Sequence, residues 1–238
     1  MGRREYEPIK SNIKFHKPDD EDAKDKAWRV RQMMIKFSGK ISFKEFIRGK
    51  PIRFGIKMLA LCASNGYSFY FDIYCGKNEK FDFLPKIVQG SRVVLQMLQE
   101  FLLKTSPRNR LQYHIYFDNL FSSPDLLVHL KNKNLRATST VRKDRIEVSN
   151  EIDAKARRGL TKVKHDSNSG TNFVTVMDSK AVSILSSAAG VTSTSNVSRY
   201  DKEANGKAAI PFLNAYKVYN NFMGGVDLHD QHCNNLMQ

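Results

Sequence analysis

Residues 114–130 read HIYFDNLFSSPDLLVHL, and this stretch contains the change of pattern that decides the fold. Residues 114–117 form a short apolar strand pattern that runs directly into Asp118. Ser123 and Pro124 then have the residue types of a helix N-cap and first helical position, and the leucines that follow recur at helical spacing. An acid at the end of a buried strand occupies the usual place of a catalytic side chain on an open sheet. Asp118 is therefore the first candidate site residue.

The flanking sequence predicts a mixed sheet with helices. Period-2 and apolar runs predict strands over residues 33–37, 54–62, 67–75 and 136–141, with a hairpin turn at Asn65–Gly66. Residues 93–102 repeat apolar side chains every three or four positions, which predicts a helix. The resulting order β-β-β-α-β-α-β indicates an α/β or α+β fold. It is not a nucleotide-binding unit, because neither GxGxxG nor GxxxxGK[ST] occurs.

The remaining segments differ in composition. Residues 1–27 are polar and charge-mixed, and we expect them to be flexible. Two apolar runs, at 173–176 and 181–185, follow a basic stretch. Residues 186–206 are rich in Ser, Thr, Gly and Asn, which predicts a flexible loop. Residues 211–238 are typical of a helix interrupted at Gly224–Gly225.

The charge balance favours nucleic acid as the partner. The chain has 39 Lys and Arg against 24 Asp and Glu, a net charge of +15, and residues 131–164 alone hold eleven basic against four acidic side chains. Such a concentration binds phosphates by releasing counterions. No basic amphipathic helix accompanies it, so nucleic acid is favoured over an anionic membrane surface. The expected DNA contacts are Arg142, Lys143, Arg145, Lys155, Arg157, Arg158, Lys162 and Lys164.

Several protein classes are excluded by composition. No run of eighteen apolar residues is present, so a membrane-spanning helix is not expected. The first residues lack the apolar core of a signal peptide. Three cysteines without a Cys-x-x-Cys pair argue against a disulfide framework and a zinc knuckle, and fit a reducing compartment.

Two further acids could join Asp118. Asp227 and Asp230 follow Gly224–Gly225 at a spacing of three, which places them on one face of a helix. Carboxylates from separate elements can hold two divalent cations about 4 Å apart at a phosphodiester, and oxygen ligands select Mg²⁺ or Mn²⁺. The alternative is that Asp118 caps a turn and that Asp227 and Asp230 are solvated helix residues.

Four motifs together resemble the piggyBac transposase family. They are YFDNLFSS at 116–123, LRATSTVRK at 135–143, YNNFMGGVDLHDQ at 219–231, and RGKPIRFGIK at 48–57. The resemblance covers about residues 28–238. It implies a DDE-type transposase domain with a ribonuclease-H-like mixed sheet, flanking helices and a β-rich insertion at about 145–190. It also implies that Asp118 and Asp227 are the second and third metal-binding aspartates, with Asp230 as an accessory acid.

The first catalytic aspartate of that family has no counterpart here. The family places it in a Val-Asp-Glu segment just before the stretch that matches residues 34–37. In an ungapped alignment Arg31 stands at the aspartate position and Gln32 at the glutamate position. A deletion that joined two family motifs is the interpretation we favour at this point. It predicts a shortened first strand and loosely packed residues 1–32, whereas simple substitution would leave the strand intact.

Three functions remain open from the sequence. The first is a truncated, catalytically inactive transposase-derived protein that binds DNA in the nucleus, with the family also allowing a homodimer. The second is an active metal-dependent nuclease in which Asp72 replaces the missing acid, although its position between Phe71 and Ile73 favours the solvent side of a strand. The third is a protein-interaction scaffold that keeps only the fold.

Overall fold

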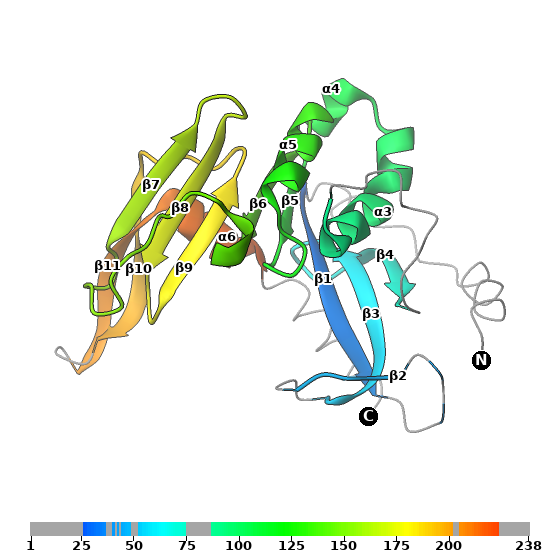
Figure 1. Ribbon diagram of the computed structural model, residues 1–238, viewed down its shortest axis with the longest axis horizontal. Coiled ribbons are helices and arrows are strands. Elements are labelled where there is room, and N and C mark those ends of the chain that lie inside the picture. Colours follow the sequence, from blue (N-terminus) through cyan, green and yellow to red (C-terminus); the bar gives the residue numbers. More distant parts are fainter. Residues whose placement is uncertain are drawn as a thin grey trace. The chain divides into compact units, whose positions relative to one another are not determined.

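The structure is a computed structural model that describes residues 26–36, 40, 42, 44–48, 52–74, 87–201 and 205–223 (Figure 1). The chain divides into two compact units. Unit 1 comprises residues 1–85 and 225–238, and unit 2 comprises residues 86–224. Across the described residues, no helix has the length and apolar character needed to cross a membrane.

Unit 1 is an antiparallel sheet built on one long central strand. Its strands are β1 (Ala27–Lys36), β2 (Lys44–Phe46), β3 (Phe54–Cys62) and β4 (Ser68–Ile73). β3 pairs along one edge with β1, and along the other with β2 and then β4. A Cβ at Gly55 would lie 2.1 Å from the carbonyl oxygen of Ile35, so glycine permits the close approach of the two strands. The predicted turn is confirmed, since Tyr67 donates its N–H to the side chain of Asn65.

The expectation of a shortened first strand is wrong. β1 runs for ten residues and pairs with β3 from Arg29 opposite Cys62 to Lys36 opposite Gly55. Trp28, Arg29 and Val30 are buried, and the Trp28 ring lies 4.6 Å from that of Phe69. Side chains on both faces of the strand are covered, so the polar composition of residues 26–32 did not prevent strand formation. Residues 1–25 lie outside the described part.

Unit 2 contains a mixed sheet in the order β5-β6-β9-β8-β7 and a separate hairpin. The strands are β5 (His114–Phe117), β6 (Arg136–Thr140), β7 (Thr161–Asp166), β8 (Thr171–Met177), β9 (Ala181–Ser186), β10 (Thr194–Asp201) and β11 (Gly206–Leu213). The helices are α3 (Gln89–Lys104), α4 (Pro107–Arg110), α5 (Pro124–Asn132) and α6 (Asn214–Met223). β5 and β6 are parallel, and the other pairs are antiparallel. The expectation of a mixed α/β fold with helices is confirmed.

Residues 114–130 fold as the sequence predicts. The Ser123 side chain accepts a hydrogen bond from the N–H of Leu126, and Pro124 is the first residue of α5. Leu126, Leu127 and Leu130 are fully buried, which fixes one face of the helix against the sheet. A strand, a capped helix and a second parallel strand therefore occupy residues 114–140.

Two expectations for the C-terminal half are wrong. We predicted a flexible loop over residues 194–201. They form β10 instead, because each residue from Thr194 to Asp201 is paired with a residue of β11. Ser and Thr are compatible with a strand when a partner strand is present. The expected helix over residues 211–238 begins only at Asn214, because Pro211 belongs to β11. Residues 224–238 lie outside the described part.

A chain of buried hydroxyl groups joins three strands of unit 2. His114 Nε2 lies 2.8 Å from Thr138 Oγ1, which lies 2.7 Å from Ser186 Oγ. Burial, and secondarily the positive charge of Arg136, lowers the pKa of His114 to about 4. The imidazole is therefore neutral in the folded state at neutral pH.

This histidine makes stability depend on pH. The unfolded chain protonates His114 near its ordinary pKa of about 6.5, whereas the folded chain does so only near 4. Its contribution is thus fully present above the unfolded pKa and is lost as the pH falls toward 4, by up to about 3 kcal/mol. Urea unfolding at about pH 7 and about pH 4.5 should show a smaller acid destabilisation for His114→Gln than for the unaltered chain. Equal losses in the two proteins would contradict a buried neutral imidazole.

Candidate functional site

Asp118 stands at the carboxyl end of β5 and turns the chain. Phe117 before it is fully buried, whereas Asp118 itself is half-buried. Its Oδ1 accepts a hydrogen bond of 2.8 Å from the N–H of Leu120, and its carbonyl oxygen accepts one of 3.2 Å from Phe121. Asp118 thus makes the turn-capping contact that one alternative predicted. A role in binding metal remains a prediction.

The loop after Asp118 is fixed from two sides. Ser91, in the first turn of α3, donates its hydroxyl to the carbonyl of Phe121 at 2.6 Å and lies 3.0 Å from Ser123 Oγ. A Cβ at Gly90 would lie 2.2 Å from the carbonyl oxygen of Leu120, so the helix approaches the loop closely there. From the other side, Ser122 Oγ lies 2.8 Å from Ser139 Oγ of β6. These serines are far apart in sequence, so no local pattern indicated them.

Arg145 clamps the same loop, and its predicted contact with DNA stays a prediction. Its Nη1 donates to three carbonyl oxygens, those of Asn119, Leu120 and Ser122, at 3.0, 3.1 and 2.7 Å. The side chain is half-buried. A guanidinium engaged with carbonyl groups retains its charge but offers fewer free N–H groups to a phosphate. Arg145 therefore positions the loop that carries Asp118.

Three other predicted DNA contacts are engaged with the protein. Lys143 forms an ion pair of 2.9 Å with Glu151 between well-exposed side chains, and Lys162 donates to the Glu151 carbonyl at 2.7 Å. Arg158 Nε lies 3.3 Å from the carboxylate of Asp178. The exposed pair contributes little to stability, and its lysine can exchange partners. The remaining predicted contacts are exposed: Arg142, Lys155, Arg157 and Lys164.

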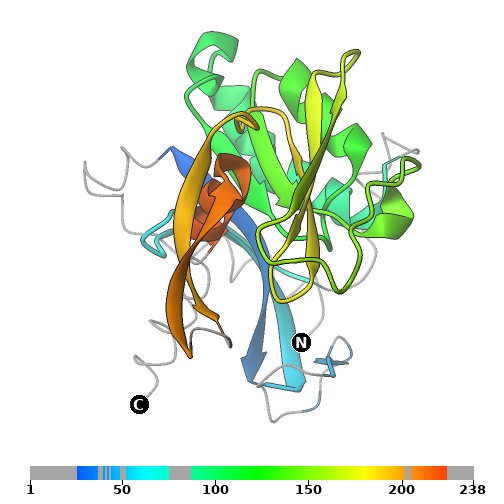
Figure 2. The same cartoon turned by 90° about the vertical axis from the view of Figure 1, so that its left-hand side faces the viewer.

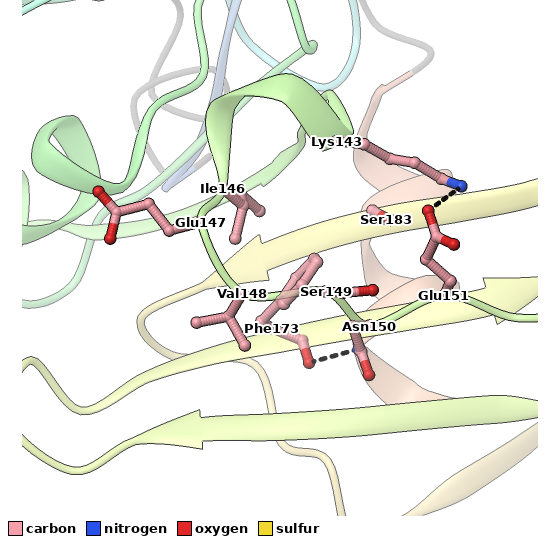
Figure 3. A pocket seen from close by; sticks show the side chains of 9 residues that line it. All are labelled: Lys143, Ile146, Glu147, Val148, Ser149, Asn150, Glu151, Phe173 and Ser183. Atoms are coloured by element: carbon pink, nitrogen blue, oxygen red, sulfur yellow. Dashed lines mark hydrogen bonds and ion pairs between the residues drawn. The ribbon is translucent and has the colours of Figure 1, made fainter.

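The segment of residues 143–151 lies over β8 and β9 and encloses a small cavity of about 130 Å³ (Figure 3). The ring of Phe173 lines it, and Asn150 donates its side-chain N–H to the Phe173 carbonyl at 3.3 Å. A larger hollow of about 540 Å³ also has Phe173 in its lining, together with Pro124, Asp125 and Val128 of α5. Asp118 lines neither space, so these hollows are separate from the candidate catalytic residue.

The other predicted site residues are placed only in part. Arg31 lies in the middle of β1, opposite Ala60. Asp72 lies in β4 opposite Leu59 and is half-buried, as are its two neighbours, and Phe71 packs against a cluster of buried residues of β1 and β3. Asp227 and Asp230 lie outside the described residues.

The described side chains do not by themselves make a metal centre. Across the part of the chain that the structure describes, no group of three or more His, Cys, Asp and Glu side chains is placed to hold a metal ion. Mg²⁺ prefers six oxygen ligands with near-ideal geometry, and commonly takes one or two carboxylates together with water and phosphate. Among the described residues with a predicted ligand role, Asp118 offers one carboxylate, and one of its oxygens already caps a turn.

Comparison with known proteins decides the family. The family model described as Transposase IS4 matches residues 23–238. The chain belongs to this family. Its similarity to curated human proteins makes it a DDE-type transposase domain of the piggyBac transposable element-derived kind, as the sequence motifs had indicated. DDE transposases typically use divalent metal ions.

Two human relatives and one solved structure document the similarity. PiggyBac transposable element-derived protein 3 is 38% identical over 204 residues, 84% of this chain and 33% of its own length. PiggyBac transposable element-derived protein 2 is 28% identical over 229 residues, 92% of this chain and 36% of its own length. The chain therefore spans about a third of each.

The solved structure is that of the piggyBac transposase in a synaptic complex with hairpin DNA. It matches with a TM-score of 0.66 at 22% identity, over 88% of this chain and 40% of that one. At this identity the match establishes a shared fold.

Replacing Arg145 should loosen the Asp118 loop. Net contributions of about 1.5–3 kcal/mol are typical for hydrogen bonds to charged groups, so Arg145→Ala should lower the free energy of unfolding by about 2 kcal/mol. Hydrogen exchange of the Leu120 and Phe121 amides should accelerate as well. Arg142→Ala is the matched control, because Arg142 is exposed, and it should change stability by less than about 0.5 kcal/mol. Indistinguishable exchange in the two variants would show that Arg145 does not hold the loop.

Proposed function

We propose that this chain is a DNA-binding domain, derived from a piggyBac transposase, that does not cleave DNA. The core is ribonuclease-H-like, and the strands β7 to β9 form the family's β-rich insertion. The observation that carries the proposal is the intact β1 strand with an arginine at the position where the family has its first catalytic aspartate. Because the chain spans about a third of its relatives, the proposal concerns this domain.

Exposed cations in unit 2 support the binding half of the proposal. Lys164 is exposed on β7, the last strand of the sheet order, while Arg142, Lys155 and Arg157 are exposed on the segments that connect β6 to β7. Edge-strand lysines also prevent strands of different molecules from pairing, which is the alternative explanation for Lys164. If Lys164 contacts a phosphate, its removal changes the salt dependence of DNA binding, whereas protection of the edge strand would leave that dependence unchanged. From the family we also propose that the protein is nuclear and that it forms a dimer.

The register of β1 supports the non-catalytic half. Arg31 lies opposite Ala60 within a continuous ladder, so substitution explains the missing acid without a loss of strand structure. An arginine cannot coordinate a cation, because its guanidinium has no acceptor atom.

DNA binding should weaken steeply with salt. Between about 50 and about 200 mM salt, the affinity for duplex DNA should fall, and each phosphate contact adds about 0.9 to the slope of log K against log salt. Lys164→Ala should reduce the slope by about 0.9 if Lys164 contacts a phosphate. Lys104→Ala removes an exposed lysine that pairs with Glu100 on α3 and should leave the slope unchanged. Filter binding provides the measurement, and an affinity independent of salt would exclude the electrostatic mechanism.

The purified chain should neither nick nor join DNA with Mg²⁺ or Mn²⁺. Nicking that disappears on Asp118→Ala would refute this expectation. Because β1 is continuous, Arg31→Asp should create Mn²⁺ binding that calorimetry can measure. Gln32→Asp is the control, since it adds a carboxylate one position along the strand. Equal Mn²⁺ binding by the two single variants would show that position 31 is not part of the site.

A further inference from the structure

The β10–β11 hairpin presents an exposed face that the proposed duplex-binding residues do not use. Antiparallel pairing places Ser198 opposite Ala209 and Tyr200 opposite Lys207, and all four are exposed. Side chains alternate across a strand, so these residues share one face of the ribbon. Small side chains leave that face flat, and Tyr200 rises from it with 56% of its surface exposed. Figure 2 shows the hairpin standing beside α6 as a long twisted ribbon.

The opposite face of the hairpin is anchored to the rest of unit 2. Arg199 Nε donates to the carboxylate of Asp178 at 3.1 Å, and Tyr216 of α6 donates its hydroxyl to the same carboxylate at 2.5 Å. Phe212 is fully buried, and its ring stacks on that of Tyr216 with centroids 4.8 Å apart. The hairpin is therefore held by ionic and apolar contacts, which presents its outer face in a fixed orientation.

The surroundings of Tyr200 are positively charged. Arg158 donates to the Tyr200 carbonyl at 2.6 Å, and it shares the single carboxylate of Asp178 with Arg199. Two guanidinium groups on one carboxylate leave an excess positive charge on the anchored face of the hairpin, behind the strand that carries Tyr200. Lys207 lies directly across the hairpin from Tyr200, and Arg157 next to Arg158 is exposed. An exposed aromatic ring with a lysine directly across the hairpin matches the chemistry of unpaired nucleotides, because the ring stacks on a base while the lysine attracts a phosphate.

We propose that Tyr200 and Lys207 form a binding site for single-stranded DNA, in which an unpaired base stacks on the Tyr200 ring. In a duplex the base faces are covered by their neighbours, so a stacking contact of this kind selects unpaired bases. The Tyr200 hydroxyl donates to Asn205 Oδ1 at 2.8 Å, which restrains the ring toward the turn and lowers the cost of ordering it on binding. The proposal deepens the proposed DNA-binding function by naming a form of DNA, and it rests on that function only in taking DNA as the partner.

Fluorescence anisotropy with a labelled oligothymidylate and a duplex of equal length tests the site. Tyr200→Ala should weaken binding of the single strand by about 5- to 100-fold, the range measured when a stacked aromatic is removed. Tyr200→Phe keeps the ring and should stay within about twofold of the unaltered chain. Duplex affinity should be the same for all three proteins. Phe54→Ala is the matched control, because Phe54 is a 59% exposed aromatic in unit 1.

The outcomes separate this proposal from the proposed function. If Tyr200→Ala binds the single strand as tightly as the unaltered chain, the stacking site is refuted, while duplex binding still supports the proposed function. Binding of the single strand without binding of the duplex would support the site and refute the duplex contacts proposed for the exposed cations. If Tyr200→Ala instead converts a dimer to a monomer in sedimentation without changing single-strand affinity, the face contacts a second copy and the proposal fails. Photocrosslinking of an iodouracil-containing single strand should label residues 194–213, and labelling elsewhere only would also overturn it.

Discussion

The parallel pairing of β5 with β6 is the constraint on which unit 2 depends. Its register places Tyr116 opposite Thr138 and Phe117 opposite Ser139. Ser139 can then hydrogen-bond to Ser122, and Thr138 to His114. A parallel pair needs a crossover connection, and α5 supplies it. The buried leucines of α5 hold this helix against the sheet. A shift of one residue would turn these hydroxyl groups to the opposite face and leave them buried without partners.

The end of β5 also explains why the basic side chains divide into two groups. The turn at Asp118 leaves several carbonyl oxygens directed toward residues 143–145, and a guanidinium satisfies three of them at once. Buried carbonyl groups require such partners. A positive charge that looks like part of a DNA-binding surface in the sequence is thus engaged in holding the candidate site. The proposed DNA contacts rest on the exposed side chains of Arg142, Lys155, Arg157 and Lys164.

The two proposals assign different forms of DNA to different parts of unit 2. Cations along β7 and its preceding segment act on phosphates, and their effect is long-ranged and independent of base pairing. The ring on the β10–β11 hairpin acts through contact with a base face, which only an unpaired strand offers. A transposase-derived domain that has lost cleavage can keep both properties, because neither requires a metal ion.

Local sequence determined the elements whose pattern is complete within a short window. The strand at 114–117, the capped helix after Ser123 and the Asn65–Gly66 turn are confirmed, because their hydrogen bonds and apolar faces depend on neighbouring residues. The piggyBac motifs also fixed the family. Only the tertiary structure decided the extent of β1, the pairing of residues 194–201 and the role of Arg145. In each of these the partner is distant in sequence: β3 covers the polar start of β1, β11 stabilises a Ser- and Thr-rich strand, and the carbonyls bound by Arg145 lie 23 to 26 residues before it. Composition reports which groups a segment carries, but contacts over such separations decide which of those groups remain available to a ligand.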